Sequence, residues 1–224
     1  MCSSDLFCRR LGNPENTFPS IHVAGTNGKG SVCTMLDKIY RDHGYRVGLF
    51  TSPHLIELGE RIRVDGKILS FAEIEKWVEK LYPIAQEMEK KEKGMGPTFF
   101  EFMTAMAFLE FKKQGVDLAI VETGLGGRLD STNVLNSELS IITTVGFDHC
   151  ELLGNNLNEI AGEKAGIIKE GRPVVVGWLE KEAQDEVFRI ASEKNAKIHP
   201  MGKDDESTLP ATNLKDRKST RLNS

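Results

Sequence analysis

The sequence predicts an α/β protein with a phosphate-binding loop and a mostly parallel β-sheet flanked by helices. Short β-rich runs alternate with longer helical segments along most of the 224 residues, and this order is typical of a parallel sheet covered by helices. A glycine-rich segment at residues 25–31 stands between an expected strand and an expected helix, as in nucleotide phosphate loops. The hydrophobic content of 39% is sufficient for one sizeable domain with its own core.

The first elements surround the glycine-rich segment. We expect a strand at residues 21–24 and, after the glycines, a helix at residues 31–43 that Gly44 ends. A second strand is expected at residues 46–51. Residues 52–60 contain proline and glycine and have no clear period, so they predict a loop near the site.

A hairpin and two capped helices come next. Residues 61–69 have an Asp-Gly turn between apolar residues, which predicts a small hairpin. Ser70 and Glu73 have the spacing of a capping box at the start of one helix, and Thr98 with Glu101 has the same spacing for a second helix.

The second half of the chain continues the alternation. Residues 117–122 and 140–145 are apolar runs that predict buried strands, each followed by a glycine-containing loop. Such loops lie at the carboxyl ends of strands, where open α/β sheets bind ligands. Helices are expected at residues 158–168 and 179–193, with a short strand at residues 173–176 between them.

Composition excludes several classes of partner and site. The net charge of −4 gives no general attraction to polyanions, so we expect no nucleic-acid partner. No apolar run approaches the roughly 20 residues of a membrane helix, so we expect no membrane partner and a cytoplasmic location. The four cysteines form no CxxC pair and are expected to be free thiols.

The glycine-rich segment supplies the groups that bind a nucleotide phosphate. Its glycines form a tight turn, its backbone N–H groups face phosphate oxygens, and a lysine adds one positive charge. A simple βα turn would not need this lysine at the helix start. In ordinary phosphate loops the next residue is Ser or Thr, which holds Mg²⁺, whereas a glycine stands here. The predicted ATP-binding residues are Thr26, Asn27, Gly28, Lys29, Gly30 and Ser31.

Mg²⁺ therefore needs ligands from other strand ends. Ser52 follows the second expected strand, Glu122 ends the buried run at residues 117–122, and His149 lies after the next strand. Hydroxyl and carboxylate oxygens suit Mg²⁺, and a histidine ligand is less usual. Each residue also has a simpler interpretation, as a loop hydroxyl, a strand-end acid or a surface histidine.

Six motifs stand in a fixed order along the chain. They are HVAGTNGKGSVC (22–33), TSPHL (51–55), ERIRVDG (60–66), TFFEFMTAMAF (98–108), VETGLGGRLDSTN (121–133) and EKAGIIKEGRPVV (163–175). Together they resemble the folylpolyglutamate synthase and dihydrofolate synthase family within the Mur ligase group. The resemblance runs from about Leu11 to His199, and GLGGRLDSTN is its most specific part.

The resemblance implies a ligase in which ATP phosphorylates a substrate carboxylate and the amine of L-glutamate then displaces the phosphate. Lys29 would hold the β- and γ-phosphates, and Glu122, His149 and Ser52 would hold Mg²⁺. Lys164 matches the family position whose amine is carbamylated by CO₂. The residues alone show Lys164 only as a helix lysine, which is usually solvated.

The resemblance also implies a site for dihydropteroate or tetrahydrofolate at Thr98, Phe100 and Asp130. A pterin ring suits an aromatic face and a carboxylate that pairs with ring N–H groups. Phe100 could instead be a core residue, and Asp130 could form a structural ion pair with Arg128.

The domain organisation is the last expectation. Residues 9–202 would form one ATP-binding domain like the central domain of Mur ligases, and we expect a monomer. Residues 1–7 and 203–224 do not resemble the family, and the polar segment 203–224 is expected to be a disordered or unrelated tail. The family's C-terminal domain would be absent. Another Mur-type amide ligase, or a catalytically incomplete ATP-binding fragment, are the alternatives.

Overall fold

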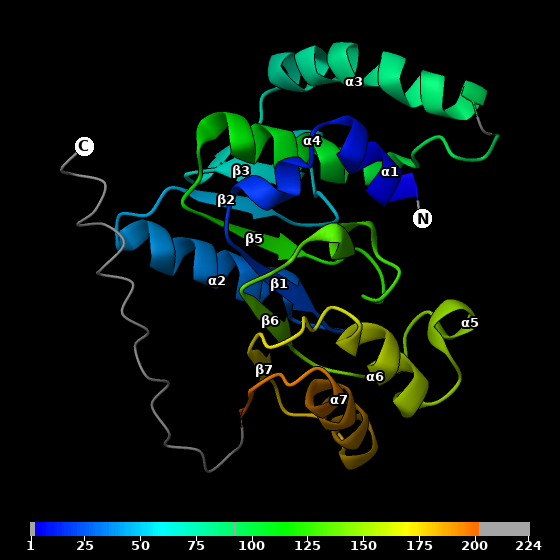
Figure 1. Cartoon of the computed structure of the whole chain (residues 1–224). Coiled ribbons are helices and arrows are strands. Elements are labelled where there is room, and N and C mark those ends of the chain that lie inside the picture. Colours follow the sequence, from blue (N-terminus) through cyan, green and yellow to red (C-terminus); the bar gives the residue numbers. More distant parts are fainter. Residues whose placement is uncertain (1–2, 92, 202–224) are drawn as a thin grey trace.

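A computed structural model describes residues 3–91 and 93–201 and confirms the α/β class (Figure 1). Eight strands of the described chain form one sheet in the order β4-β3-β2-β5-β1-β6-β7-β8. The central strands are parallel, and only the β2–β3 and β3–β4 pairs are antiparallel. The expected mostly parallel sheet is therefore present, with the expected hairpin at one edge.

The strands that the sequence predicts all form, with bounds that differ by a few residues. The short β8 was not expected, because its two half-exposed residues and its exposed proline give no apolar run. The strands are β1 Ser20–Ala24, β2 Val47–Phe50, β3 Ile62–Val64, β4 Lys67–Ile68, β5 Leu118–Glu122, β6 Leu139–Ile142, β7 Val174–Val176 and β8 Ile198–Pro200.

The predicted helices form as well, and the structure adds two short ones. The additional helices are α1 and α5, and three 3₁₀ turns lie at Pro14–Thr17, Leu58–Arg61 and Ser131–Val134. The helices are α1 Ser3–Arg10, α2 Lys29–Asp42, α3 Phe71–Lys91, α4 Phe99–Gln114, α5 Cys150–Leu153, α6 Leu157–Ala165 and α7 Lys181–Glu193.

Local signals explain where α3 and α4 begin. The predicted capping box of Thr98 and Glu101 is present in both directions, and Gly115 ends α4 with a left-handed φ of 59°. The predicted box at Ser70 is only half formed. The carboxylate of Glu73 accepts from the Ser70 N–H at 2.9 Å, and the Ser70 hydroxyl donates to that carboxylate rather than capping a backbone N–H.

Helices cover both faces of the sheet. Ile120 of β5 packs with Leu49 and Cys33 in the cluster under α2, whereas its neighbours Ala119 and Val121 pack in the cluster under α4. Figure 1 shows α4 above β2 and β5, with α2 below them. Farther along the sheet, α6 and α7 pack on β6 and β7. Because both faces are covered, the strands appear in the sequence as continuous apolar runs.

The folded unit begins before residue 9, the expected boundary. Helix α1 packs on α4, and Phe7 is fully buried in the same cluster as Phe108. The hydroxyl of Ser4 donates to the carboxylate of Glu101 at 2.7 Å. The described part of residues 1–7, which do not resemble the family in sequence, is therefore integral to the core. The predicted tail at residues 203–224 lies outside the described residues.

Two expectations from composition can be compared with the structure. Cys33 and Cys150 are free thiols, as expected, and Cys2 lies outside the described residues. Within the described ranges, every helix is too short or too polar to cross a membrane.

Candidate functional site

Three loops meet at the carboxyl end of the sheet because their strands are parallel neighbours. Strand β1 pairs with β5 on one side and with β6 on the other. The loops that follow these strands are the phosphate loop (residues 25–31), the β5 loop (residues 123–134) and the β6 loop (residues 143–149). This end of a parallel sheet is where α/β proteins bind ligands.

The phosphate loop presents backbone N–H groups at the start of α2. Gly28 precedes the helix with a left-handed φ of 82°, a conformation that glycine adopts without strain. It provides no side-chain cap, so the first N–H groups of α2 face outward with the positive end of the helix dipole. Such a helix start binds phosphate oxygens. Asn27 and Ser31 are exposed here.

The β6 loop holds the phosphate loop in place. The Thr26 N–H donates to the Thr144 carbonyl at 2.8 Å, and the Asn27 N–H donates to the Thr144 hydroxyl at 2.9 Å. The Gly146 N–H also donates to the Thr26 hydroxyl, at 3.0 Å. A Cβ atom on Gly25 would lie 1.9 Å from Thr143 Oγ1, so only glycine fits there. The sequence did not indicate these contacts of Thr143 and Thr144.

Lys29 is the first residue of α2 and folds back over the phosphate loop. Its Nζ donates to the carbonyls of Gly25 at 3.0 Å and Thr26 at 3.2 Å. The lysine charge is therefore already held at the loop whose N–H groups would bind phosphate. A charge in that position neutralises phosphate oxygens.

Glu122 and Ser52 come together beside Gly30. The Ser52 N–H donates to Glu122 Oε2 at 3.0 Å, and a Cβ atom on Gly30 would lie 3.6 Å from the same oxygen. Burial raises the pKa of Glu122, and the Ser52 N–H and the charge of Lys29 partly oppose this. Position 30, where other phosphate loops carry a hydroxyl, thus lies against a buried carboxylate.

These groups fit a magnesium ion, although His149 is not joined to them. His149 is the N-cap residue before α5, with a φ of 47°; its side chain is exposed, and its Nε2 lies 3.6 Å from Asp148 Oδ1. Within residues 3–91 and 93–201, no three His, Cys, Asp or Glu side chains are grouped closely enough to hold a metal. The carboxylate of Glu122 and the hydroxyl of Ser52 are oxygen donors of the kind that Mg²⁺ prefers, with phosphate oxygens and water completing its shell.

Lys164 is not the solvated helix lysine that the residues alone suggest. It is 2% exposed in α6, and burial lowers its pKa to about 8. The positive charge of Lys29 lowers this pKa further, whereas Asp148 opposes the shift. A lowered pKa increases the fraction of neutral amine, which is the form that reacts with CO₂.

Phe100 lies between the sheet and the β5 loop. Its ring centroid is 5.7 Å from that of Phe50, and a Cβ atom on Gly124 would meet its ring at 2.5 Å. The half-buried ring is therefore packed against both residues, and only glycine fits at position 124. Thr98 is exposed two residues earlier, at the N-cap of α4.

The alternative interpretation of Asp130, an ion pair with Arg128, is contradicted by the structure. Arg128 instead pairs with Glu163 of α6, with Nη2 2.8 Å from Oε1. Asp130 Oδ2 accepts from the N–H groups of Gly124 at 2.9 Å and Leu125 at 2.8 Å. Its Oδ1 accepts from the Thr132 N–H at 3.0 Å and from the Thr132 hydroxyl. The carboxylate thus organises its own loop, and burial raises its pKa.

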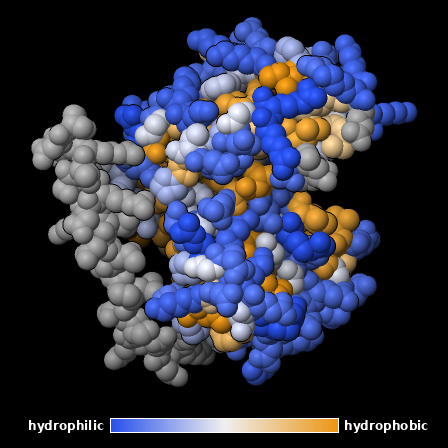
Figure 2. Space-filling view, in the orientation of Figure 1, coloured by the Kyte–Doolittle hydropathy of each residue, from blue (hydrophilic) through white to orange (hydrophobic). Residues whose placement is uncertain are grey.

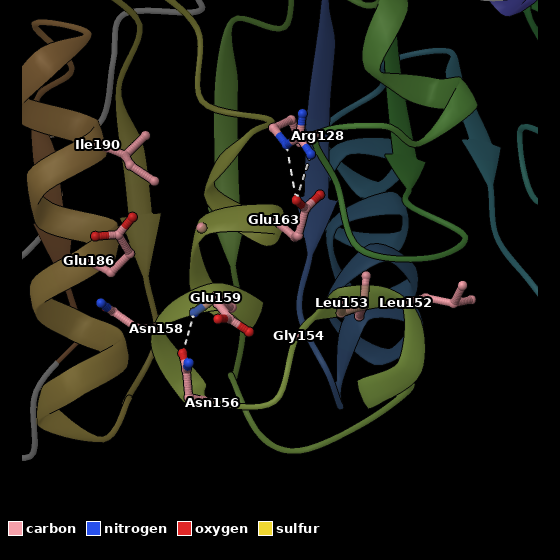
Figure 3. A pocket seen from close by; sticks show the side chains of 11 residues that line it. Arg128, Leu152, Leu153, Gly154, Asn156, Asn158, Glu159, Glu163, Glu186 and Ile190 are labelled. Atoms are coloured by element: carbon pink, nitrogen blue, oxygen red, sulfur yellow. Dashed lines mark hydrogen bonds and ion pairs between the residues drawn. The ribbon is translucent and has the colours of Figure 1, made fainter.

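A hollow of the described surface lies next to the β5 loop, away from the phosphate loop (Figure 3). Its volume is about 640 Å³, and Figure 3 shows the Arg128–Glu163 pair at one end with Glu186 and Ile190 of α7 at the other. Figure 2 shows apolar surface over α5, where Leu152 is 72% exposed. The hollow is lined by Arg128, Leu152, Leu153, Gly154, Asn156, Asn158, Glu159, Gly162, Glu163, Glu186 and Ile190.

Comparison with known proteins finds similar sequences and a matching family model. Residues 23–223 match the family model of the Mur ligase middle domain, a range that includes the segment expected to be an unrelated tail. The chain is 48% identical over 188 residues to the dihydrofolate synthase/folylpolyglutamate synthase of Bacillus subtilis, and this covers 84% of the chain and 43% of that protein. It is 45% identical over 175 residues to the folylpolyglutamate synthase of Arabidopsis thaliana, covering 78% of the chain and 30% of that protein.

Solved structures give the same result. A folylpolyglutamate synthase complex with AMPPCP and folate matches with a TM-score of 0.86 and 35% identity, over 90% of this chain and 49% of that one. The folylpolyglutamate synthase of Thermotoga maritima matches with a TM-score of 0.83 and 42% identity, over 90% of this chain and 46% of that one. The chain therefore spans about half the length, or less, of the proteins that it matches.

Proposed function

Because the chain belongs to the family of the Mur ligase middle domain, we propose that it acts in the ATP-dependent joining of L-glutamate to a folate or dihydropteroate carboxylate. The observation that carries the proposal is the group formed by Lys29, Glu122 and Ser52 at the phosphate loop. The relatives named as folylpolyglutamate or dihydrofolate synthases support the choice of substrates.

The proposed reaction has two steps. A carboxylate oxygen of the pteroate or folate attacks the γ-phosphorus of ATP, ADP leaves, and an acyl phosphate forms. The glutamate amine then attacks the acyl carbon, and inorganic phosphate leaves. Both steps need positioning and neutralisation of phosphate charge more than covalent help from the protein.

The phosphate loop supplies this positioning. The N–H groups at the start of α2 bind phosphate oxygens, and the Lys29 ammonium exchanges its bonds to two loop carbonyls for the β- and γ-phosphates. We assign Thr26 and Asn27 to the same site, since their contacts with the β6 loop fix the loop's shape.

Glu122 and Ser52 would hold Mg²⁺ in this proposal. The ion supplies charge neutralisation at the phosphates, and the carboxylate of Glu122 is kept close to position 30 for this role. His149 as a third ligand and carbamylation of Lys164 stay predictions. Burial of the Lys164 amine and its lowered pKa support the second of these.

The pterin-bearing substrate is proposed to lie at Phe100, Thr98 and Asp130. The Phe100 ring offers an aromatic face, and the Asp130 carboxylate offers acceptor oxygens. A pterin N–H group would share an oxygen that already accepts from Gly124 and Leu125, or from Thr132.

ADP release by the purified chain tests the proposal. The assay contains Mg²⁺, ATP, L-glutamate and either dihydropteroate or tetrahydrofolate, and Lys29→Ala is the control. Release that requires the pterin and disappears in the control supports the ligase reaction. ATP binding without release identifies a catalytically incomplete fragment, and binding of a uridine-linked muropeptide in place of dihydropteroate identifies another Mur-type ligase. A cytoplasmic location and a monomeric state stay predictions.

A further inference from the structure

His22 is a buried histidine that the proposed reaction does not use. It lies in the middle of β1 with no exposed surface. Its Nε2 is 2.7 Å from Thr132 Oγ1 in the β5 loop, whereas its Nδ1 is buried without a hydrogen-bond partner. Buried polar atoms without partners are rare because they cost free energy. An apolar residue would fill a purely structural core position without this cost.

The bonds of Thr132 define the proton positions. Its hydroxyl is in contact with both Asp130 Oδ1 and His22 Nε2. A carboxylate only accepts, so the single hydroxyl proton goes to Asp130, and the hydroxyl oxygen accepts from the N–H at His22 Nε2. His22 is neutral in this arrangement, and burial lowers its pKa to about 3, with a smaller contribution from Lys169.

The chain of bonds continues beyond Asp130 to the surface of the β5 loop. Asp130 Oδ2 accepts from the N–H groups of Gly124 and Leu125, and Gly124 packs against the ring of Phe100. A donor fixed in the central strand is thereby connected, through the Thr132 hydroxyl, to Asp130 and from there to Phe100, two of the three residues assigned to the pterin.

We propose that His22 is a positioning residue, which donates to Thr132 and so orients Asp130 for the pterin-bearing substrate. This inference rests on the proposed function for its substrate, but not for the geometry of the β5 loop. His22 itself has no surface with which to touch a ligand. The loop also has a second anchor, since Thr104 Oγ1 lies 2.9 Å from Ser131 Oγ, so variants of His22 should still fold.

The chain offers a matched control for a lost buried hydrogen bond. Ser140 of β6 is the register partner of His22 and is also fully buried. Its hydroxyl donates to the Ile167 carbonyl at 3.0 Å, outside the chain of bonds that leads to Asp130. Ser140→Ala therefore removes a comparable bond next to His22 without affecting the β5 loop.

The experiment compares His22→Leu, His22→Gln, Thr132→Val and Ser140→Ala in two measurements. Hydrogen exchange is followed at the amides of Gly124, Leu125 and Thr132, and calorimetry gives the affinities for dihydropteroate and ATP. For His22→Leu we expect about tenfold faster exchange at these amides and about tenfold weaker dihydropteroate binding. ATP affinity should change less than about twofold. His22→Gln, which retains a donor near the Nε2 position, should restore most of both losses.

The non-additivity of two variants sharpens the test. His22→Leu should add little to Thr132→Val, because the two residues act through one bond. Unchanged amide exchange in His22→Leu, or equal changes in Ser140→Ala, would overturn the inference. So would a parallel loss of ATP affinity, which indicates general damage. If the unaltered chain binds ATP but not dihydropteroate, the proposed substrate is wrong, and the exchange rates still decide whether His22 holds Asp130.

Discussion

The phosphate loop and the β5 loop leave adjacent strands, yet they use their polar groups in opposite ways. In the phosphate loop the backbone N–H groups at the start of α2 face outward, and Lys29 makes only two bonds to loop carbonyls. In the β5 loop, side chains bond back to the chain: Asp130 accepts from three backbone N–H groups, and Asn133 donates to the Arg128 carbonyl. In the proposed function, the first loop would bind through donors that are available, and the second through a shape that its own hydrogen bonds hold.

The largest expected effect concerns the contact that holds the phosphate loop. Gly25→Ala should lower the free energy of unfolding by about 2–3 kcal/mol, because its Cβ would lie 1.9 Å from Thr143 Oγ1. Urea unfolding measures this loss. Gly171→Ala is the control, because nothing lies within 4 Å of its Cβ and only the positive φ of 64° opposes alanine. A loss in Gly25→Ala no larger than in the control would show that the two loops are not in tight contact.

Glu122→Gln tests whether a buried group at the phosphate loop is kept for binding at the expense of stability. The pKa of Glu122 is raised, so its stabilising contribution is lost as the pH rises through the folded-state pKa, and at neutral pH the charge destabilises the fold. The free energy of unfolding of the variant should be about 1 kcal/mol higher than that of the unaltered chain, because a neutral amide replaces a buried charge. The variant should also bind Mg²⁺-ATP about tenfold more weakly.

Urea unfolding and calorimetry measure these two quantities. Glu182→Gln removes an exposed carboxylate from α7 and should change neither one. A stability gain without weaker Mg²⁺-ATP binding would remove Glu122 from the metal site.

The pH dependence of stability in His22→Gln tests the buried histidine that contacts the β5 loop. The pKa of His22 is lowered from 6.5 to about 3, so between these values the unfolded state binds a proton that the folded state does not. The stability that neutral His22 contributes is present above pH 6.5 and is lost as the pH falls. Between pH 7 and pH 5 the unaltered chain should lose about 2 kcal/mol more than His22→Gln.

Unfolding titrations at the two pH values measure the difference. His43→Gln replaces an exposed histidine at the end of α2 and should keep the pH dependence of the unaltered chain. The interpretation fails if His22→Gln and His43→Gln respond alike.

The smallest expected effect concerns the outer side of the β5 loop. Arg128 and Glu163 form a partly exposed pair at 2.8 Å, so a double-mutant cycle should give a coupling of about 0.5–1 kcal/mol. A cycle between Arg128 and Asp130 should give none, because Asp130 bonds to backbone N–H groups instead. A larger coupling in the second cycle would show that Arg128 and Asp130 do form an ion pair, contrary to the structure.

The phosphate loop could be predicted as a strand–loop–helix element because its conformation depends on local features. Glycines, one lysine and their place between a strand and a helix are all read along the chain, and Glu122 could be placed because buried parallel strands end at a common edge. The capping box at Thr98 was correct for the same reason, since its partners are three residues apart.

The remaining features depended on residues far apart in the sequence. Arg128 has Asp130 two positions away but pairs with Glu163, since the β5 loop lies against α6. Lys164 has the sequence context of a solvated lysine, yet packing buries it beside the charge of Lys29. Helix α1 gave no strong signal, because its burial depends on the apolar surface of α4.

The sequence by itself therefore determined the α/β class, the phosphate loop and the strand ends that carry Glu122 and Ser52, because periodicity, glycine placement and capping are local. Only the tertiary structure decided which carboxylate pairs with Arg128, that Lys164 is buried, and that His22 is connected to Asp130 through Thr132. The Arg128–Glu163 contact joins residues 35 positions apart, and the His22–Thr132 contact joins residues 110 positions apart. Both depend on the way neighbouring strands bring distant loops together.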